Sequence, residues 1–240
     1  MSDISKDGFT TIDLLALGAH PDDIEIHAGG AIAQLTALGK SVIFIDATRG
    51  ECSSNGTMEL REVESRAAAG LLGVQQRLNL KFSDTRLNRE THELTDSLVQ
   101  LLRHWRPAVV LAPPLDARHP DHRTLAQCTK DAIFLSGLCK IMPTLPAMLP
   151  RARLIHYHEH ESARPDFLID VSPTWKLKLQ ALQCYASQFV AHENCVATGL
   201  NNGFLERLEH HARTWGATIG VTHAECFTSD RPVMLGGLLG

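Results

Sequence analysis

The sequence lacks the features that would place it in a membrane or outside the cell. It has no run of eighteen apolar residues, so we expect no membrane-spanning helix. Its first ten residues, MSDISKDGFT, contain neither the basic segment nor the apolar segment of a secretory signal. The six cysteines are scattered singly, without a CxxC pair, which is typical of reduced thiols rather than of disulfides. Together these absences predict a cytoplasmic protein.

The sequence also lacks the charge and the glycine motif of two common classes of binding protein. Its formal net charge is -4 at pH 7 and its lysines and arginines are scattered, so we expect no binding to nucleic acid or to an anionic membrane surface. No GxGxxG follows a predicted strand, which argues against a dinucleotide site. The chain has 240 residues, 44% of them hydrophobic and 21% charged, and no repeat or linker divides it. We therefore expect one globular domain over residues 1–240.

Apolar runs that alternate with amphipathic segments predict an α/β fold. The expected strands are residues 13–19, 41–47, 76–81, 108–112, 154–159, 167–171 and 222–227. The expected helices are residues 24–38, 58–72, 94–103, 123–135, 172–189 and 204–215. Because strands joined through helices run parallel, we predict a Rossmann-like, doubly wound, mostly parallel sheet with helices on both faces. Polar loops at 19–25, 48–56 and 113–122 follow three of these strands and should meet at the carboxyl edge, where open α/β sheets bind ligands.

Two short motifs of histidine and aspartate lie in those loops and predict a metal site. The first is HPDD at 20–23 and the second is HPDH at 119–122. His20 and Asp23 are three residues apart and can reach one ion, and His122 supplies the third protein ligand that a catalytic zinc site requires. Either motif alone could be an ordinary turn, because Asp and Pro favour turns for local reasons. The two together favour one bound divalent ion, which is zinc by ligand type, although Fe(II) or Co(II) would suit the same ligands.

The other polar residues of the two motifs can each be given one catalytic task. Asp22 stands beside a ligand without being needed as one, so it can accept a proton from a nucleophilic water. His119 can face the reacting group, stabilise an oxyanion as an imidazolium and protonate the departing amine. Asp121 can hold the other ring nitrogen of His119 and keep that ring cationic. The predicted chemistry is metal-assisted hydrolysis.

With AHPDD near the amino terminus and HPDH after a mid-chain strand, the chain resembles the PIG-L/LmbE family of zinc-dependent N-acetylglucosaminide deacetylases. Four further stretches, SSNGTMELR, RPDFLIDVS, YASQF and AECF, resemble its bacillithiol-biosynthesis branch, which deacetylates N-acetylglucosaminyl-malate. The resemblance covers nearly the whole chain and implies the same ligands, the same base and the same electrophilic histidine as the motifs. It also implies a homo-oligomer, commonly a trimer or a hexamer.

Four residues are candidates for binding a small-molecule glycoside substrate. Arg61 and Arg153 match substrate-binding arginines of the branch, and the planar fork of Arg61 would suit a malate carboxylate. Arg61 could instead pair with a glutamate on its own helix. Arg49 and Asn55 lie on the loop 48–56, whose hydrogen-bonding groups suit sugar hydroxyls, unless the loop is only a solvated turn.

Four more histidines leave alternatives open. His156, His158 and His160 would share one face of a strand, so a second metal site is geometrically possible. A polar edge strand or an oligomer contact is the favoured reading of these three. His223 lies near the start of the last strand and could reach the site.

The predicted activity is removal of acetate from N-acetylglucosaminyl-malate. The alternative is a related deacetylase that acts on a chitooligosaccharide, a mycothiol-type conjugate or a glycan antibiotic precursor. Cys52 and Cys226 stand where the branch has an apolar residue and a glycine, a departure that bears on the substrate and leaves the metal chemistry intact. A rival of another class is a metal-dependent regulator or carrier that binds sugar without turnover. Such a protein needs no general base, so Asp22 speaks against it.

Overall fold

The fold is built on one mixed sheet of seven strands. A computed structural model describes residues 10–159, 164–191, 193 and 195–233. The strands lie in the order β3-β2-β1-β4-β5-β7-β6. They are β1 (Leu14–Gly18), β2 (Val42–Thr48), β3 (Gln76–Phe82), β4 (Val109–Ala112), β5 (Arg153–Tyr157), β6 (Phe167–Asp170) and β7 (Ala224–Ser229). Strands β1 to β5 are parallel, and β7 runs antiparallel to both of its neighbours.

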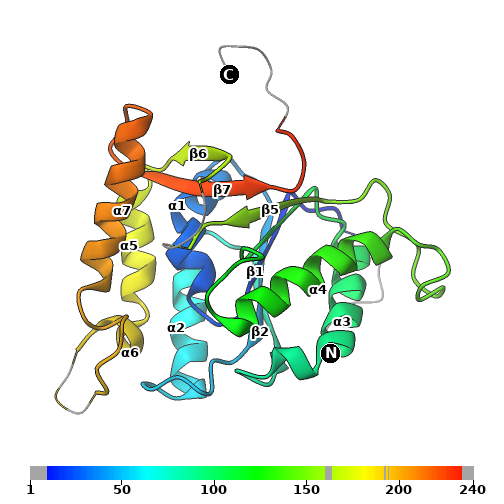
Figure 1. The fold of residues 1–240 in the computed structure, drawn as a ribbon, viewed down its shortest axis with the longest axis horizontal. Coiled ribbons are helices and arrows are strands. Elements are labelled where there is room, and N and C mark those ends of the chain that lie inside the picture. The colour runs from blue at the N-terminus through cyan, green and yellow to red at the C-terminus, as the bar shows by residue number, and fades with distance from the viewer. Residues whose placement is uncertain (1–9, 160–163, 192, 194, 234–240) are drawn as a thin grey trace.

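Helices cover both faces of this sheet (Figure 1). They are α1 (Asp23–Ala37), α2 (Met58–Leu71), α3 (Thr91–Trp105), α4 (Pro120–Ser136), α5 (Trp175–Gln183), α6 (Ala186–Phe189) and α7 (Phe204–Thr218), with a 3-10 turn, η1, at Leu87–Arg89. Alternate residues of β1 enter different clusters of the core. Leu14 and Ala16 pack with α1, α2 and α5, whereas Leu15 and Leu17 pack with α3 and α4. The predicted doubly wound, mostly parallel α/β architecture is confirmed.

The register of the parallel strands brings the polar loops to one edge. Gly18, the last residue of β1, is paired with Asp46 of β2, so the loops after these strands begin at nearly the same level. The backbone N–H of Thr48 donates to the carbonyl of Ala19 at 2.9 Å and joins the two loops. Farther along the second loop, the N–H of Cys52 donates to Asp84, just beyond β3, at 2.9 Å. Hydrogen bonds therefore join the loops at the carboxyl edge of the sheet to one another.

The first turn of α1 is fastened to the sheet by a buried ion cluster. Arg77 of β3 donates two hydrogen bonds to Asp46 of β2, at 2.7 and 2.8 Å, and pairs with Glu25 of α1. The hydroxyl of Tyr185 donates to the same Glu25 at 2.8 Å. A bidentate arginine fixes geometry as well as charge. This cluster holds α1 in place two residues beyond Asp23.

Most element boundaries differ from the predicted ones by one to three residues, and three of the differences bear on the site. The single helix predicted at 172–189 is instead two helices, α5 and α6, because the backbone of Tyr185 leaves the helical conformation between them. Helix α4 begins at Pro120, which suits a first helical position because it needs no N–H partner. Strand β5 ends at Tyr157, so Glu159 lies beyond the strand.

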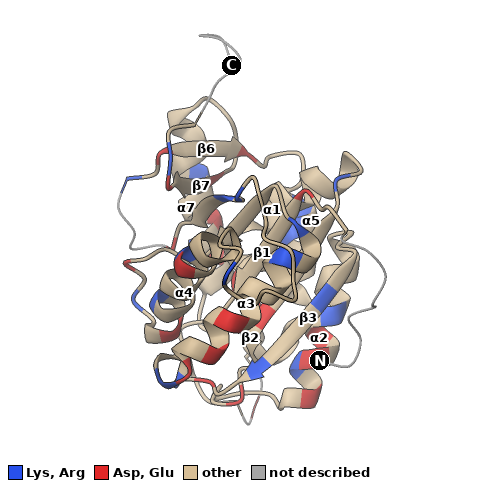
Figure 2. Ribbon diagram, turned by 90° about the vertical axis from the view of Figure 1, so that its right-hand side faces the viewer, with Lys and Arg blue, Asp and Glu red and all other residues tan. Residues whose placement is uncertain are grey.

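The charges of the surface are mixed. Figure 2 shows acidic and basic residues on the α3 and α4 side of the molecule, and basic residues along β3. Within the described part of the chain, no helix is both long enough and apolar enough to span a membrane.

Candidate metal centre and active site

The first motif folds as a strained turn between β1 and α1. The backbone N–H of His20 donates to Oδ2 of Asp23 at 2.8 Å, which closes the turn over Pro21. Asp22 occupies the N-cap position of α1 without a side-chain capping bond, and its φ is 111°, in the left-handed region that few residues other than glycine, asparagine and aspartate adopt. This conformation separates two adjacent carboxylates, because Asp23 turns toward His20 whereas Asp22 turns toward Arg61. Strain of this kind persists where the surrounding structure enforces it, often at functional sites.

The structure brings together the three residues that the sequence predicts as metal ligands. Oδ2 of Asp23 lies 3.4 Å from Nδ1 of His20 and 3.2 Å from Nε2 of His122, and these two nitrogens are 3.3 Å apart. Three atoms bound tetrahedrally to zinc at about 2.0–2.1 Å would lie roughly 3.3–3.4 Å from one another. The side chains of Asp23 and His122 are nine-tenths buried. The residues present therefore fit a zinc ion in both chemistry and spacing.

The ring nitrogens that face away from this triangle meet carboxylates. Nε2 of His20 lies 3.1 Å from Oδ1 of Asp84 and 3.6 Å from Oδ2 of Asp121. Nδ1 of His122 bonds to Oε1 of Glu159. Neither Asp84 nor Glu159 was among the predicted site residues. Asp84 follows the predicted strand 76–81, as the two motifs follow theirs, which was an available signal, whereas Glu159 lay inside the predicted strand 154–159.

Two other overlapping groups also bring ligand atoms within 4.8 Å of one another: His20 with His119 and His122, and His20 with Asp84 and Asp121. In the second group the acids are already bound by backbone donors. Oδ2 of Asp84 accepts the N–H of Cys52 at 2.9 Å, and Asp121 accepts the N–H of Thr85 at 2.6 Å. These two acids serve better as acceptors for His20 than as ligands. The triangle of His20, Asp23 and His122 is therefore the candidate metal site.

The electrostatics of the triangle favour positive charge. Burial would lower the pKa of His20, but hydrogen bonds to Asp121, Asp23 and Asp84 outweigh it and hold that pKa well above the usual value. Burial would also lower the pKa of His122, yet Asp23 and Glu159 raise it to about 9. Burial would raise the pKa of Asp23, but the two histidines hold it well below its usual range. A divalent cation is the kind of ligand that such a surplus of carboxylates would attract.

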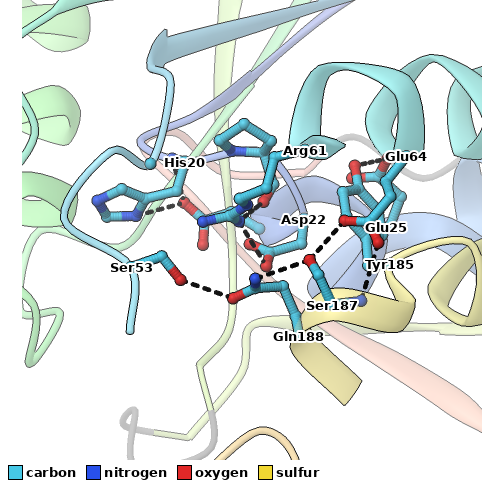
Figure 3. A network of polar contacts seen from close by, with 12 residues as sticks. His20, Asp22, Glu25, Ser53, Arg61, Glu64, Tyr185, Ser187 and Gln188 are labelled. Carbon is cyan, nitrogen blue, oxygen red and sulfur yellow. Dashed lines mark hydrogen bonds and ion pairs between the residues drawn. The ribbon is translucent and has the colours of Figure 1, made fainter. Parts of the chain in front are cut away.

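Asp22, the predicted general base, is buried beside Arg61 (Figure 3). Nη2 of Arg61 donates to Oδ2 of Asp22 at 2.8 Å and also to the carbonyl of Pro21. Burial raises the pKa of Asp22 to about 7, against the opposing charge of Arg61. A carboxylate that titrates near neutral pH can both accept and return a proton. The arginine lies under Gly50, where a Cβ would overlap its Nη1.

His119, the predicted electrophile, lies beside both of the predicted histidine ligands. Its ring centroid is 4.7 Å from that of His20 and 5.0 Å from that of His122. Its Nδ1 accepts the backbone N–H of Asp121 at 3.2 Å as the cap of α4, so the proton of a neutral ring resides on Nε2. Burial lowers the pKa of His119, and the charges of His20 and His122 lower it further. The arrangement thus suits a neutral donor rather than the expected imidazolium.

The contact expected between the Asp121 carboxylate and His119 takes another form. The backbone N–H of Asp121 bonds to His119, while its carboxylate accepts the N–H groups of Thr85 and Leu87 and lies toward His20. Asp121 therefore supports the ligand His20 with its side chain and His119 with its main chain. The sequence did not predict η1 or the loop before it, and backbone N–H groups of these segments bind the carboxylate of Asp121.

The four predicted substrate residues lie in different surroundings. Arg61 holds Asp22, as described above. The side-chain amide of Asn55 bonds at both ends to the backbone of Val196, at 2.9 and 2.8 Å, and so ties two loops together. Arg49 is exposed and lines a groove of about 660 Å³ along β3, none of whose lining residues is a predicted metal ligand. Arg153 begins β5 and therefore lies at the amino edge of the parallel strands, so the structure does not bring it to the site.

The other histidines engage partners away from the triangle. Nδ1 of His156 bonds to the carbonyl of Pro113 at 2.6 Å, and Nε2 of His158 bonds to Oγ1 of Thr228. His160 lies outside the described residues. His223 stacks on Trp175 of α5, with ring centroids 4.5 Å apart, and so lies on the α5 side of the sheet. The side chains of His156 and His158 do not converge on a second metal site.

Comparison with known proteins identifies the family. The model of the PIG-L family, GlcNAc-PI de-N-acetylase, matches residues 15–133. Diacetylchitobiose deacetylase of Thermococcus kodakarensis is 30% identical over 191 residues, which cover 73% of this chain and 70% of that protein. The probable N-acetyl-alpha-D-glucosaminyl L-malate deacetylase 2 of Bacillus anthracis is 26% identical over 82% of this chain and 90% of that protein.

A solved structure extends the likeness to the whole fold. A conserved protein of Thermus thermophilus is 36% identical, with a TM-score of 0.84, and the match covers 95% of this chain and 98% of that one. The residues 15–133 matched by the family model include both motifs and therefore the whole of the triangle. The chain belongs to the PIG-L family of deacetylases, hydrolases that act on amide bonds.

Proposed function

We propose that this protein is a zinc-dependent deacetylase that removes the N-acetyl group from an N-acetylglucosamine derivative. The observation that carries the proposal is the triangle of His20, Asp23 and His122, with ligand atoms 3.2 to 3.4 Å apart and a buried carboxylate, Asp22, beside it. A protein that only bound a sugar through a metal ion would need the triangle but would not need the carboxylate of Asp22. A buried carboxylate whose pKa is raised to about 7 is the kind of group that general-base catalysis uses.

The mechanism assigns one task to each residue. A zinc ion held by the triangle would polarise the acetamide carbonyl and make water a stronger nucleophile. Asp22 takes the proton of the water as its oxygen attacks the carbonyl carbon. His119 donates its Nε2–H to the oxyanion that develops on the carbonyl oxygen. When the C–N bond breaks, Asp22 returns the proton to the departing amine, and the products are acetate and a free amino sugar.

Two substrates deserve direct comparison. The resemblance to the bacillithiol branch supports N-acetylglucosaminyl-malate, and the Bacillus anthracis relative bears that substrate in its name. The Thermococcus kodakarensis relative, at higher identity, is a deacetylase of diacetylchitobiose. One geometric observation favours the uncharged disaccharide: the guanidinium of Arg61, the expected partner of a malate carboxylate, already bonds to Asp22 and Pro21.

The test is a substrate panel in which released acetate is measured for purified protein loaded with zinc. The panel contains N-acetylglucosaminyl-malate, diacetylchitobiose and free N-acetylglucosamine. Faster release from the malate conjugate would establish the bacillithiol-type substrate, and faster release from the disaccharide would establish the chitobiose type. No release from any N-acetylglucosamine compound, with zinc bound at one ion per chain, would contradict the proposed function.

The metal itself is tested by removal and replacement. Dialysis against a chelator should abolish acetate release, and addition of zinc should restore it. Co(II) and Fe(II) should be tested in parallel, since both suit nitrogen and carboxylate ligands. Unchanged activity of metal-free protein would contradict the assignment.

A further inference from the structure

Each of the two histidines of the triangle is held from behind by a carboxylate that belongs to neither motif. Both rings use one nitrogen for the triangle and the other for an acid: Nε2 of His20 faces Asp84 at 3.1 Å, and Nδ1 of His122 faces Glu159. A ring can present a lone pair to an ion only if its proton resides on the opposite nitrogen. A carboxylate that accepts this N–H therefore selects the tautomer that binds metal.

The carboxylate that faces His20, that of Asp84, is held by one backbone donor, and the backbone of Asp84 is held by Glu51. Oδ2 of Asp84 accepts the N–H of Cys52 at 2.9 Å, and the N–H of Asp84 donates to Glu51 at 3.0 Å. Its other oxygen, Oδ1, is the one that meets His20. Because the loop after β2 holds Asp84, the imidazole of His20 has one preferred orientation.

Glu159 occupies the corresponding place behind His122. Strand β5 ends at Tyr157, and this early end lets the Glu159 side chain reach across to the first turn of α4. The side chain is 17% exposed, and that of His122 is 9% exposed, so little solvent competes for the bond. The acid comes from a different strand than any residue of the two motifs, which is why sequence spacing did not reveal it.

We propose that Glu159 is a positioning residue that fixes the tautomer and orientation of His122, as Asp84 does for His20, and thereby raises the affinity of the triangle for a divalent cation. This inference rests on the proposed metal site and adds residues to it. Loss of such an outer carboxylate typically lowers metal affinity about 10- to 100-fold.

The test compares zinc affinity in three variants, measured by competition with a chromophoric chelator. Glu159→Ala removes the acceptor, and we expect zinc to bind about 10- to 100-fold more weakly. Glu159→Gln keeps an acceptor oxygen without the charge, so its affinity should be intermediate. Glu62→Gln is the matched control, because Glu62 lies on the exposed face of α2 and pairs only with Arg66 among the ion pairs described there.

Two readouts separate positioning from a general effect on folding. The metal-free variants should all remain folded at the assay temperature, as measured by circular dichroism, whereas the visible spectrum of the Co(II) form should change in the two Glu159 variants alone. Wild-type affinity and spectrum in Glu159→Ala would overturn the inference. Binding of two zinc ions per chain would overturn it as well, because the outer acids would then be ligands. If the wild-type protein binds no zinc, the proposed function itself fails, which is a distinct result.

Discussion

Two buried clusters of charge in this molecule differ in whether they are complete. In the first, Lys178 of α5 pairs with Glu225 of β7 at 2.7 Å, and the two oxygens of Glu225 accept the N–H groups of Gly30 and Ala31 in α1 at 2.9 and 2.8 Å. One cation meets one anion, and both side chains are almost fully buried. The cluster joins α1, α5 and β7, and its charges balance within the protein.

The second cluster is the triangle of His20, Asp23 and His122 with its surrounding acids. Four carboxylates surround two imidazoles, and they belong to Asp23, Asp84, Asp121 and Glu159. Even with both rings protonated, negative charge exceeds positive charge within this group. A buried excess of charge lowers the stability of a protein unless a partner of opposite charge neutralises it. The protein itself balances the charge of the Lys178–Glu225 pair, whereas the acids around the triangle leave negative charge that an external cation would balance.

The largest effect should come from breaking the triangle. We expect His122→Ala to lower the zinc content of purified protein from about one ion per chain to a small fraction, because three protein ligands are the usual minimum of a catalytic site. Acetate release should fall to background. Metal analysis by mass spectrometry measures the first quantity, and His210→Ala, at an exposed residue of α7, is the control. Full zinc in the His122 variant would show that the triangle is not the metal site.

The next effect should fall on turnover without loss of metal. Asp22→Asn removes the base, and asparagine tolerates the left-handed backbone at this position, so the turn should survive. We expect kcat to fall about 10²- to 10⁴-fold, the usual contribution of a general base. Zinc content should stay near that of the wild type. Turnover within a few-fold of wild type would exclude Asp22 as the base.

The balanced cluster should respond in stability rather than in activity. Lys178→Met retains the stem of the side chain and leaves the buried Glu225 without its cation, which typically costs about 3–5 kcal/mol. Unfolding in urea measures the loss. Lys40→Met is the control, because the pair of Lys40 with Asp13 is half exposed and screened by solvent, so its loss should cost much less than the loss of Lys178. Equal effects of the two variants would mean that burial does not distinguish the pairs.

The comparison also explains how much of the site the sequence could predict. The triangle came from two motifs whose residues are three apart and lie directly after apolar runs, so local patterns sufficed for His20, Asp23 and His122. Glu159 was hidden because its role depends on where β5 ends and on the neighbouring helix. Asp84 was missed because β3 lies two strands from β1 in the sheet, and the spacing of residues in the sequence does not show which strands lie close together.

The fold followed from the sequence more fully than the substrate residues did. Runs such as Leu14–Gly18 are buried on both faces of the sheet, so their continuous apolar sequence was enough to predict central strands of a parallel sheet. Arg153 shows the limit of matching by resemblance. Its strand was predicted, but its position at the amino end of that strand places it at the edge opposite the metal triangle. Asn55 shows another limit, since a polar loop residue can serve its own fold by binding Val196.

The smallest effect should come from one methyl group at the balanced cluster. A Cβ on Gly30 would lie 2.7 Å from Cβ of Val171, closer than real Cβ atoms pack, and 3.1 Å from Oε1 of Glu225. Alanine favours a helix over glycine by about 1 kcal/mol. Overpacking of this kind costs about 1–3 kcal/mol, so we expect Gly30→Ala to destabilise the protein in spite of the gain in helix propensity.

Gly70→Ala is the matched control for that substitution. Gly70 is also helical, but a Cβ there would meet nothing within 4 Å, so the variant should gain up to about 1 kcal/mol. Opposite signs in urea unfolding would show that close contact with Val171 and Glu225, rather than the helix itself, requires glycine at position 30. A gain in both variants would mean that α1 can shift away from β7, and the balanced cluster would then be a looser structure than its distances indicate.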